Sequence, residues 1–478
     1  MLQQSRYIEE AQWIADLVID KLAYTDKQLP IRIDCLTGKI LDARRLVEDL
    51  GDYVQYIYYL GKTTDNQKLM DFALGSTFIV SDNYQNKTGI FDNVFKDKSK
   101  EDYTSLAQIK QTGVRAFLRQ TERNSIDWND NADVFYGLSS LYFLSSDAKI
   151  GDILLKYQRG IKRFMHNSGY LYGATKGPRK YMSRTPATFV EGLLHSYLKN
   201  QSMESLSLAK KLVSPWLNSE FFKRYGLFPS NMLINQSLMK FNNHIGERVY
   251  KKYAYWNGFC AIQKVNTNFL HGILELQKVT KDIFYETAIR KWINSYEEKM
   301  YKYNLYGDYN VFTRKVYFGN KGLNISLAVL GFYADSCKAF NDEKILSIIE
   351  NRVTKILDVQ SKLGFFRDSH DPLEPKYKRG FLDMQTDMSV VLIKTFCLTK
   401  NRVYLEAAKI CIDSIIKHLK RPFGYIEYFN ADTGAADYHS RMFIKMLTLF
   451  LKALLLLDAA LNDEDVFDGD LFIISGDR

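Results

Sequence analysis

Carboxylates recur in the polar segments that come just before apolar stretches of this sequence. A carboxyl group can give or take a proton at a reacting oxygen, and two of them together can act as general acid and general base. A histidine accompanies the last carboxylate, in DYHSR, and its ordinary pKa of about 6.5 suits proton transfer. We therefore expect acid–base chemistry on Asp133, Asp383, Asp387, Asp437 and His439.

Each of these aspartates has a structural alternative, because Asp is favoured at helix N-caps and in the first turn. Asp387 follows Asp383 by four residues, so both carboxylates, with Gln385 between them, reach the same turn. A cap needs only one of them, and the pair therefore favours ligand contact. Glu191 lies inside an apolar segment, where it either pairs with Arg184 or contacts a ligand.

Aromatic, amide and basic residues accompany these carboxylates. Trp128 and Asn129 share a segment with Asp133 and offer a stacking face and an amide for hydroxyl groups. A basic segment from Lys176 to Arg184 could bind a uronate carboxylate or a phosphate, so an acidic sugar is the preferred substrate. The candidate ligand contacts are Trp128, Asn129, Arg179, Arg184, Glu191, Trp256, Asn257, Gln385, Tyr425 and Arg441.

Several other kinds of site lack their sequence signals. The sequence contains no HExxH or CxxC pair, and no GxxxxGK[ST], GxGxxG or GxSxG, so we expect no metal and no organic cofactor. The net charge is +10, but lysines and arginines are spread along the chain and no DNA- or RNA-binding motif accompanies them. We expect a small sugar or an oligosaccharide as ligand and no nucleic acid.

The cysteines and the apolar stretches indicate in which cellular compartment the protein works. The five cysteines are widely spaced and odd in number, and the first twenty residues are amphipathic rather than a signal peptide, so we expect a cytoplasmic protein. The most apolar stretch, from Met442, contains Lys445, Lys452 and Asp458. Charges at a bilayer centre are costly, so this stretch is predicted to be a core helix and not a membrane span.

An internal repeat organises the elements that position these residues. Each unit has an apolar helix, a short turn, an amphipathic helix, and then Gly followed by aromatic or aliphatic residues. The shortest interval between these Gly positions is 57 residues (169 to 226) and the longest is 81 (226 to 307). The Gly positions are 89, 169, 226, 307, 364 and 424. We expect Gly to end each outer helix, and the aromatic residues after it to be sugar-stacking platforms.

Seven apolar inner helices are predicted, and seven amphipathic outer helices alternate with them. Inner helices that are apolar all round favour a closed ring over an open solenoid, and either six or seven hairpins fit. We expect an all-α domain over residues 1–461 and an acidic tail over 462–478. The inner helices are predicted near 43–61, 131–145, 185–200, 256–278, 322–340, 383–399 and 437–461.

With its Gly-aromatic steps, the sequence resembles the (α/α) toroid proteins, a six-hairpin glycosidase-like class that includes unsaturated glucuronyl hydrolases and N-acylglucosamine 2-epimerases. YWNGF at 255–259 is similar to a W-x-x-GF stretch of such hydrolases. YHSR at 438–441 is similar to a stretch opening the last helix of the epimerases, although the spacing here is His-x-Arg. The resemblance implies a closed (α/α)6 or (α/α)7 toroid and a glycoside hydrolase-like enzyme. A sugar epimerase or isomerase using His439, and a toroid that only binds glycan or protein, stay open as alternatives, and the oligomeric state is open too.

Overall fold

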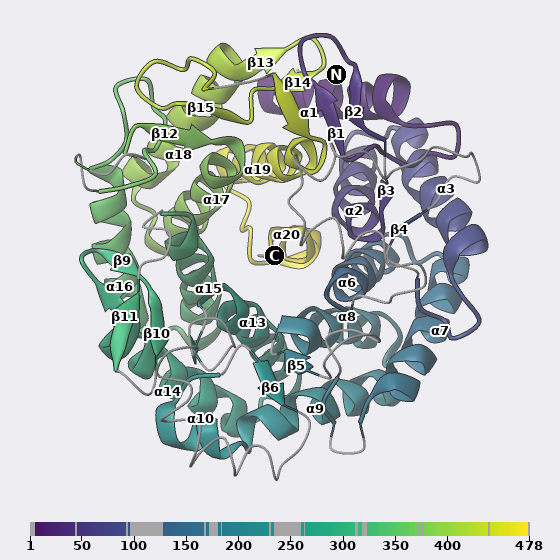
Figure 1. The fold of residues 1–478 in the computed structure, drawn as a ribbon, viewed down its shortest axis with the longest axis vertical. Coiled ribbons are helices and arrows are strands. Elements are labelled where there is room, and N and C mark those ends of the chain that lie inside the picture. Colours follow the sequence, from purple (N-terminus) through teal and green to yellow (C-terminus); the bar gives the residue numbers. More distant parts are fainter. Residues whose placement is uncertain are drawn as a thin grey trace.

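A computed structural model gives the fold, viewed along the ring axis in Figure 1. It describes residues 5–43, 45–91, 94–95, 128–166, 169–171, 180–182, 184–228, 231–233, 260–261, 263–310, 314–317, 323–370, 373, 377–437 and 440–476. These residues form two concentric layers of helices around a central axis (Figure 1).

The inner layer is a closed ring of seven helices within the described residues. Each inner helix packs on the next one in the chain, and the last packs back on the first. Of the six or seven hairpins that the sequence allows, the structure thus has seven. The inner helices are α2 (Val47–Thr63), α6 (Trp128–Ser145), α8 (Arg184–Asn200), α13 (Gln263–Thr280), α15 (Asn324–Phe340), α17 (Leu382–Thr399) and α19 (Lys445–Leu461).

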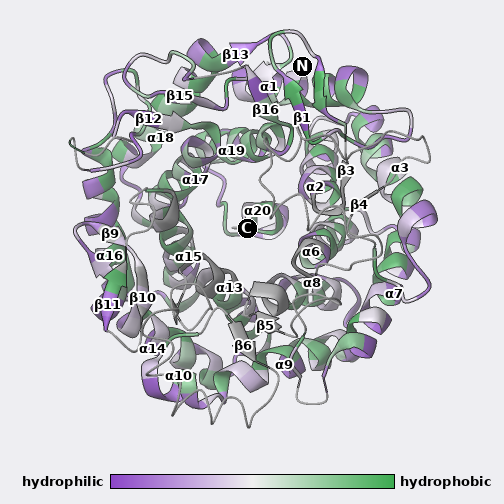
Figure 2. Cartoon of the chain, in the orientation of Figure 1, coloured by the Kyte–Doolittle hydropathy of each residue, from purple (hydrophilic) through white to green (hydrophobic). Residues whose placement is uncertain are grey.

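The outer layer carries the amphipathic helices. In α7, for example, Ile153, Tyr157 and Ile161 are buried while Lys156 and Arg159 are exposed. Figure 2 shows hydrophobic residues concentrated where the two layers meet. The outer helices are α1 (Arg6–Leu17), α3 (Gln67–Tyr84), α7 (Ala148–Phe164), α9 (Met203–Leu217) with the short α10 (Glu220–Tyr225), α14 (Ile283–Met300), α16 (Glu343–Leu357) and α18 (Arg402–Ser414). A π-helical turn extends α1 over Val18–Leu22 and α18 over Ile415–Leu419.

Short strands occupy the connections that lead from each outer helix to the next inner helix. Strands of neighbouring connections pair with one another, so these connections lie at one end of the ring and the inner helices run parallel. We call this the strand end. The cross-connection pairs are β3 (Arg45–Leu46) with β4 (Val94–Phe95), β5 (Lys180–Met182) with β6 (Asn231–Leu233), β7 (Cys260–Ala261) with β10 (Asp308–Asn310), which also pairs with β11 (Lys315–Tyr317), and β12 (Arg379–Phe381) with β15 (Tyr428–Asn430).

The ends of the chain close the ring. Strand β1 (Arg32–Asp34) lies between β2 (Ile40–Asp42) and β16 (Arg441–Phe443), and Ile33 is opposite Met442. The sequence predicted that the last inner helix begins near residue 437. In the structure α19 begins only at Lys445, because residues 441–443 form β16 and pair with β1. The hairpins β8 (Tyr301–Lys302) with β9 (Leu305–Tyr306) and β13 (Lys420–Arg421) with β14 (Gly424–Tyr425) complete the strands.

The repeated glycines do not all end helices. Gly226 caps α10 in a left-handed conformation, as expected. Gly364, with φ +97°, instead lies in a tight turn that brings Gln360 opposite Phe366, and its N–H donates to the Ser361 carbonyl at 2.9 Å. A Cβ atom there would be 2.5 Å from Ile410 of α18, so this glycine lets the loop approach the next outer helix.

The acidic segment after α19 lies inside the ring. Val466, Phe467 and Leu471 are buried, and the short helix α20 (Gly469–Ser475) occupies the centre in Figure 1. The apolar residues between the acidic ones explain this position, because they lose contact with water there.

Candidate functional site

Charged side chains gather at the strand end where the last inner helix begins. Lys445, the first residue of α19, lies 2.7 Å from the Asp52 carboxylate of α2. The Asp52 side chain is 1% exposed, whereas that of Lys445 is 29% exposed. The ion pair therefore holds a buried carboxylate at the point where the first and last inner helices meet.

Glu427 is a second buried carboxylate at this place. Its Oε2 accepts the Phe443 N–H at 3.1 Å, just before α19, and its backbone carbonyl accepts the Leu382 N–H at 2.9 Å, where α17 begins. Burial raises the pKa of Glu427, although the Phe443 N–H and the arginines Arg32 and Arg441 act in the opposite direction. A carboxyl that keeps its proton to higher pH suits a general acid.

Two arginines flank Glu427 on the sheet that closes the ring. Arg32 of β1 places its guanidinium 3.7 Å from the centre of the Phe443 ring, and burial lowers its pKa. Arg441 of β16 lies opposite Asp34. The sequence predicted Arg441 as a ligand contact but gave no reason to select Arg32 or Glu427. The only signal for Glu427 was a carboxylate within the otherwise apolar and aromatic stretch after Gly424.

Asp133 lies close to Asp52. A Cβ atom at Gly51 would be 2.7 Å from the Asp133 carbonyl oxygen, so these turns of α2 and α6 are in direct contact. Asp133 is the sixth residue of α6 and is buried. It is therefore too far into the helix to be an N-cap.

Asp383 and Asp387 are the second and sixth residues of α17, and both are partly exposed. The N-cap of α17 is Phe381, which makes no side-chain capping bond. The N-cap alternative is thus wrong for both aspartates, although Asp383 still lies in the first turn. Asp437 was predicted at a helix opening, but it precedes β16, and its N–H donates to the Tyr428 carbonyl at 3.0 Å.

Two predicted ligand contacts are instead part of the core. The Gln385 amide accepts the Phe366 N–H at 2.8 Å and donates to the Phe366 carbonyl at 2.9 Å, and the side chain is fully buried. Tyr425 is also fully buried, and its hydroxyl donates to Glu10. The aromatic residues Phe91, Phe228 and Phe366, which follow other glycines, are buried too. In these units the expectation of sugar platforms is wrong, because the rings are buried in the hydrophobic core.

For most of the other predicted residues the structure describes only the backbone, or does not describe the residue. Glu191 is buried on α8. Trp128 and Asn129 begin α6, and Arg184 begins α8, but their side chains are outside the description. His439, Arg179, Trp256 and Asn257 lie outside the described residues, as does most of the basic segment before α8.

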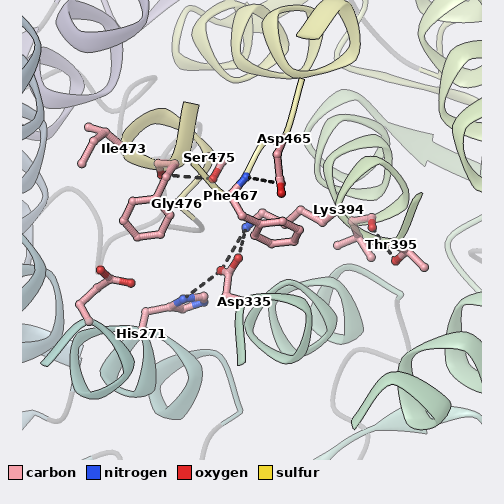
Figure 3. A network of polar contacts seen from close by, with 12 residues as sticks. His271, Asp335, Lys394, Thr395, Asp465, Phe467, Ile473, Ser475 and Gly476 are labelled. Atoms are coloured by element: carbon pink, nitrogen blue, oxygen red, sulfur yellow. Dashed lines mark hydrogen bonds and ion pairs between the residues drawn. The ribbon is translucent and has the colours of Figure 1, made fainter. Parts of the chain in front are cut away.

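A separate charged group lies deeper in the ring, on three consecutive inner helices (Figure 3). Lys394 of α17 lies 3.1 Å from both carboxylate oxygens of Asp335 of α15, and His271 Nδ1 of α13 lies 3.5 Å from the same carboxylate. Glu275, one turn after His271, is buried and accepts from Lys278 at 3.1 Å. Burial raises the pKa of Glu275, and Lys278 opposes that shift.

Among the described residues, no three histidine, cysteine or carboxylate side chains are grouped so that they could hold a metal ion. Within the described part of the chain, too, no helix combines the length and apolar character needed to cross a membrane.

No protein-family model matches the sequence, and no curated protein matches it in sequence. Solved structures do match its fold. A D-mannose isomerase aligns with a TM-score of 0.55 at 10% identity, over 95% of this chain and 98% of its own. A GH76 α-mannanase of Bacteroides thetaiotaomicron aligns with a TM-score of 0.54 at 12% identity, over 98% and 99%. The chain has the (α/α) toroid fold. A cellobiose 2-epimerase from Bacillus thermoamylovorans also shares this toroid, with a TM-score of 0.51 and 15% identity over 69% of this chain and 88% of its own.

Proposed function

We propose that this toroid is a carbohydrate-active enzyme whose reaction takes place at the strand end, around the start of α19. One observation carries the proposal. The Leu382 N–H, at the start of α17, donates a hydrogen bond to the Glu427 backbone carbonyl. This bond brings a buried carboxyl with a raised pKa to the helix that carries Asp383 and Asp387. Two carboxyl groups in different environments are the usual requirement for glycoside hydrolysis.

The proposed step is a hydrolysis. Glu427 gives its proton to the glycosidic oxygen as the bond from that oxygen to the anomeric carbon breaks. Water adds to the anomeric carbon, and its proton passes to the Asp383 or Asp387 carboxylate.

The proposed substrate is a sugar or oligosaccharide, with a preference for an acidic one. The toroid structures that match this fold include α-mannanase variants in complex with mannotriose and mannotetrose. An acidic group is supported by Arg32 and Arg441, which lie beside Glu427 and can bind a carboxylate. Cys35, Cys337, Cys397 and Cys411 are all free and buried, which supports a reducing, cytoplasmic location.

Epimerisation or isomerisation is the second candidate, because proteins with this fold include a mannose isomerase and a cellobiose 2-epimerase. In that reaction His439 would remove the proton next to the sugar carbonyl. The neighbouring Ser440 is held firmly, since its hydroxyl donates to Asp34 and its carbonyl accepts the Cys35 N–H at 2.6 Å.

One screen tests the proposed function and separates its alternatives. Neutral and uronate-containing oligosaccharides are incubated with the protein in D₂O and followed by NMR. Hydrolysis creates new reducing ends, whereas epimerisation by proton abstraction places deuterium on the carbon next to the carbonyl without cleavage.

Glu427→Gln should abolish cleavage at unchanged melting temperature, and Glu406→Gln on the exposed face of α18 is the control. Binding without either product would favour a toroid that only binds glycan.

A further inference from the structure

The C-terminal segment, residues 462–476, is enclosed by the inner helices. The side chains of Val466, Ile473 and Ile474 are 0 to 1% exposed, although most of the other residues of this segment are polar or acidic. The Tyr136 hydroxyl of α6 donates to the Ile473 carbonyl at 3.3 Å, and Lys452 of α19 donates to the Gly476 carbonyl at 2.6 Å. Both contacts lie near the middle of their helices, so the segment reaches well into the ring.

Two ion pairs hold the segment where the inner helices end. Lys338, in the last turn of α15, lies 2.6 Å from Asp465, and Lys62, in the last turn of α2, lies 2.6 Å from Asp470. Lys278, near the end of α13, lies 3.8 Å from the centre of the Phe472 ring. Acidic residues of the segment thus meet basic residues at the end of the ring opposite the strand end.

The size of the ring explains why a helix fits there. Helices packed about 8–10 Å apart place seven axes roughly 10 Å from the centre of a ring. Subtracting a helix radius of about 5 Å leaves a central space of roughly the same radius, wide enough for one more helix. Six axes would lie closer to the centre and leave less room, so α20 matches a ring of seven.

The segment also covers the deeper charged group. Figure 3 shows Phe467 beside the Lys394 and Asp335 side chains. The Cys397 thiol, on the same helix as Lys394, lies beside the backbone of Val466. The segment therefore separates these buried side chains from the water at this end of the ring.

We propose that residues 462–476 are a separable plug, held by the pairs Lys338–Asp465 and Lys62–Asp470, which closes the ring at the end opposite the strand end. The plug seals the ring so that a ligand enters from the strand end. It can leave while the two helix layers stay folded, because the side chains of its two ion pairs are 28 to 46% exposed, whereas those of Lys394 and Asp335 in the ring are at most 6% exposed. This inference does not depend on which reaction the toroid performs.

The cysteines provide the test in the full-length protein. Cys397 is covered by the plug, whereas Cys411 of α18 is fully buried beside Gln385 and away from it. The rate at which iodoacetamide alkylates each cysteine is measured by mass spectrometry in native buffer. The double variant Asp465→Asn with Asp470→Asn removes both ion pairs. The matched control, Asp463→Asn with Glu464→Gln, makes the same change in charge at two exposed residues of the segment.

Alkylation of Cys397 should be about three- to tenfold faster in the Asp465/Asp470 variant than in the control, the effect of losing two partly exposed ion pairs. Cys411 should not change. Raising the salt concentration with the unmodified protein should reproduce the effect, because salt screens such pairs. The inference is overturned if Cys397 reacts alike in both variants, or if both cysteines become reactive together, since the segment would then unfold only with the whole ring.

Discussion

Gly137 of α6 lies against Gly51 of α2, so closely that a Cβ atom on Gly137 would be 2.4 Å from the Gly51 Cα and 2.1 Å from its carbonyl oxygen. Asp52 and Asp133 lie within one turn of this crossing. The two glycines therefore fix the spacing of two helices that carry buried carboxylates at the strand end. Nothing but hydrogen fits between these backbones.

Gly137→Ala should destabilise the protein by at least about 2 kcal/mol, because the added methyl group meets backbone atoms that cannot move aside. Urea unfolding followed by circular dichroism measures the effect. Gly151→Ala on α7 is the control, since its Cβ would meet only the edge of the Tyr142 ring, at 3.2 Å. Equal stability of the two variants would show that the α2–α6 crossing can relax.

Gln385→Met should cost about 2–4 kcal/mol of stability, because it leaves the Phe366 N–H and carbonyl buried without their partners. Met has a similar volume, so the loss comes from hydrogen bonding rather than from a cavity. Gln67→Met on the exposed face of α3 should be nearly neutral. If Gln385→Met lost activity at full stability, Gln385 would be a ligand contact after all.

Asp383→Asn and Asp387→Asn test the proposed acid–base role. If either carboxylate takes a proton from water, its Asn variant should lose at least about 100-fold in kcat while the melting temperature stays unchanged. A role in the first turn alone would instead cost at most about 1 kcal/mol of stability and leave turnover intact. The comparison requires a substrate from the oligosaccharide screen.

Glu275→Gln should change how stability depends on pH. Burial raises the pKa of Glu275, so the folded chain holds this proton more tightly than the unfolded chain. Glu275 therefore stabilises the folded state fully at pH values below the pKa of the carboxyl in the unfolded chain, about 4.3. This stabilisation is lost as the pH rises through the higher pKa of the folded chain. The stability of the Gln variant relative to wild type should therefore increase from about pH 4 upward.

Urea unfolding at a series of pH values measures this difference. Glu298 provides a control of opposite sign, because Lys299 lowers its pKa. For Glu298→Gln the relative stability should fall, not rise, as the pH increases toward the unfolded pKa of about 4.3, and it should stay flat above that pH. A flat profile for Glu275→Gln would show that the carboxyl is ionised alike in both states.

The sequence alone determined the helices and their two layers, because these depend on local periodicity. The stripe of Ile153, Tyr157 and Ile161 on α7 and the all-round apolar α17 could be recognised without any contact being known. The glycine steps likewise indicated the repeat, and the inner helices that are apolar all round favoured its closure into a ring.

Only the tertiary structure decided which polar groups are used by the fold and which remain for chemistry. Gln385 and Asp383 look equally available in the sequence, yet the loop of the preceding unit occupies the Gln385 amide, and Asp383 is partly exposed. Glu427 gains its environment from β16 and from the start of α17, which are separate in sequence. The acidic segment enters the ring because seven helices leave space at the centre, a property of the closed assembly that no local pattern encodes.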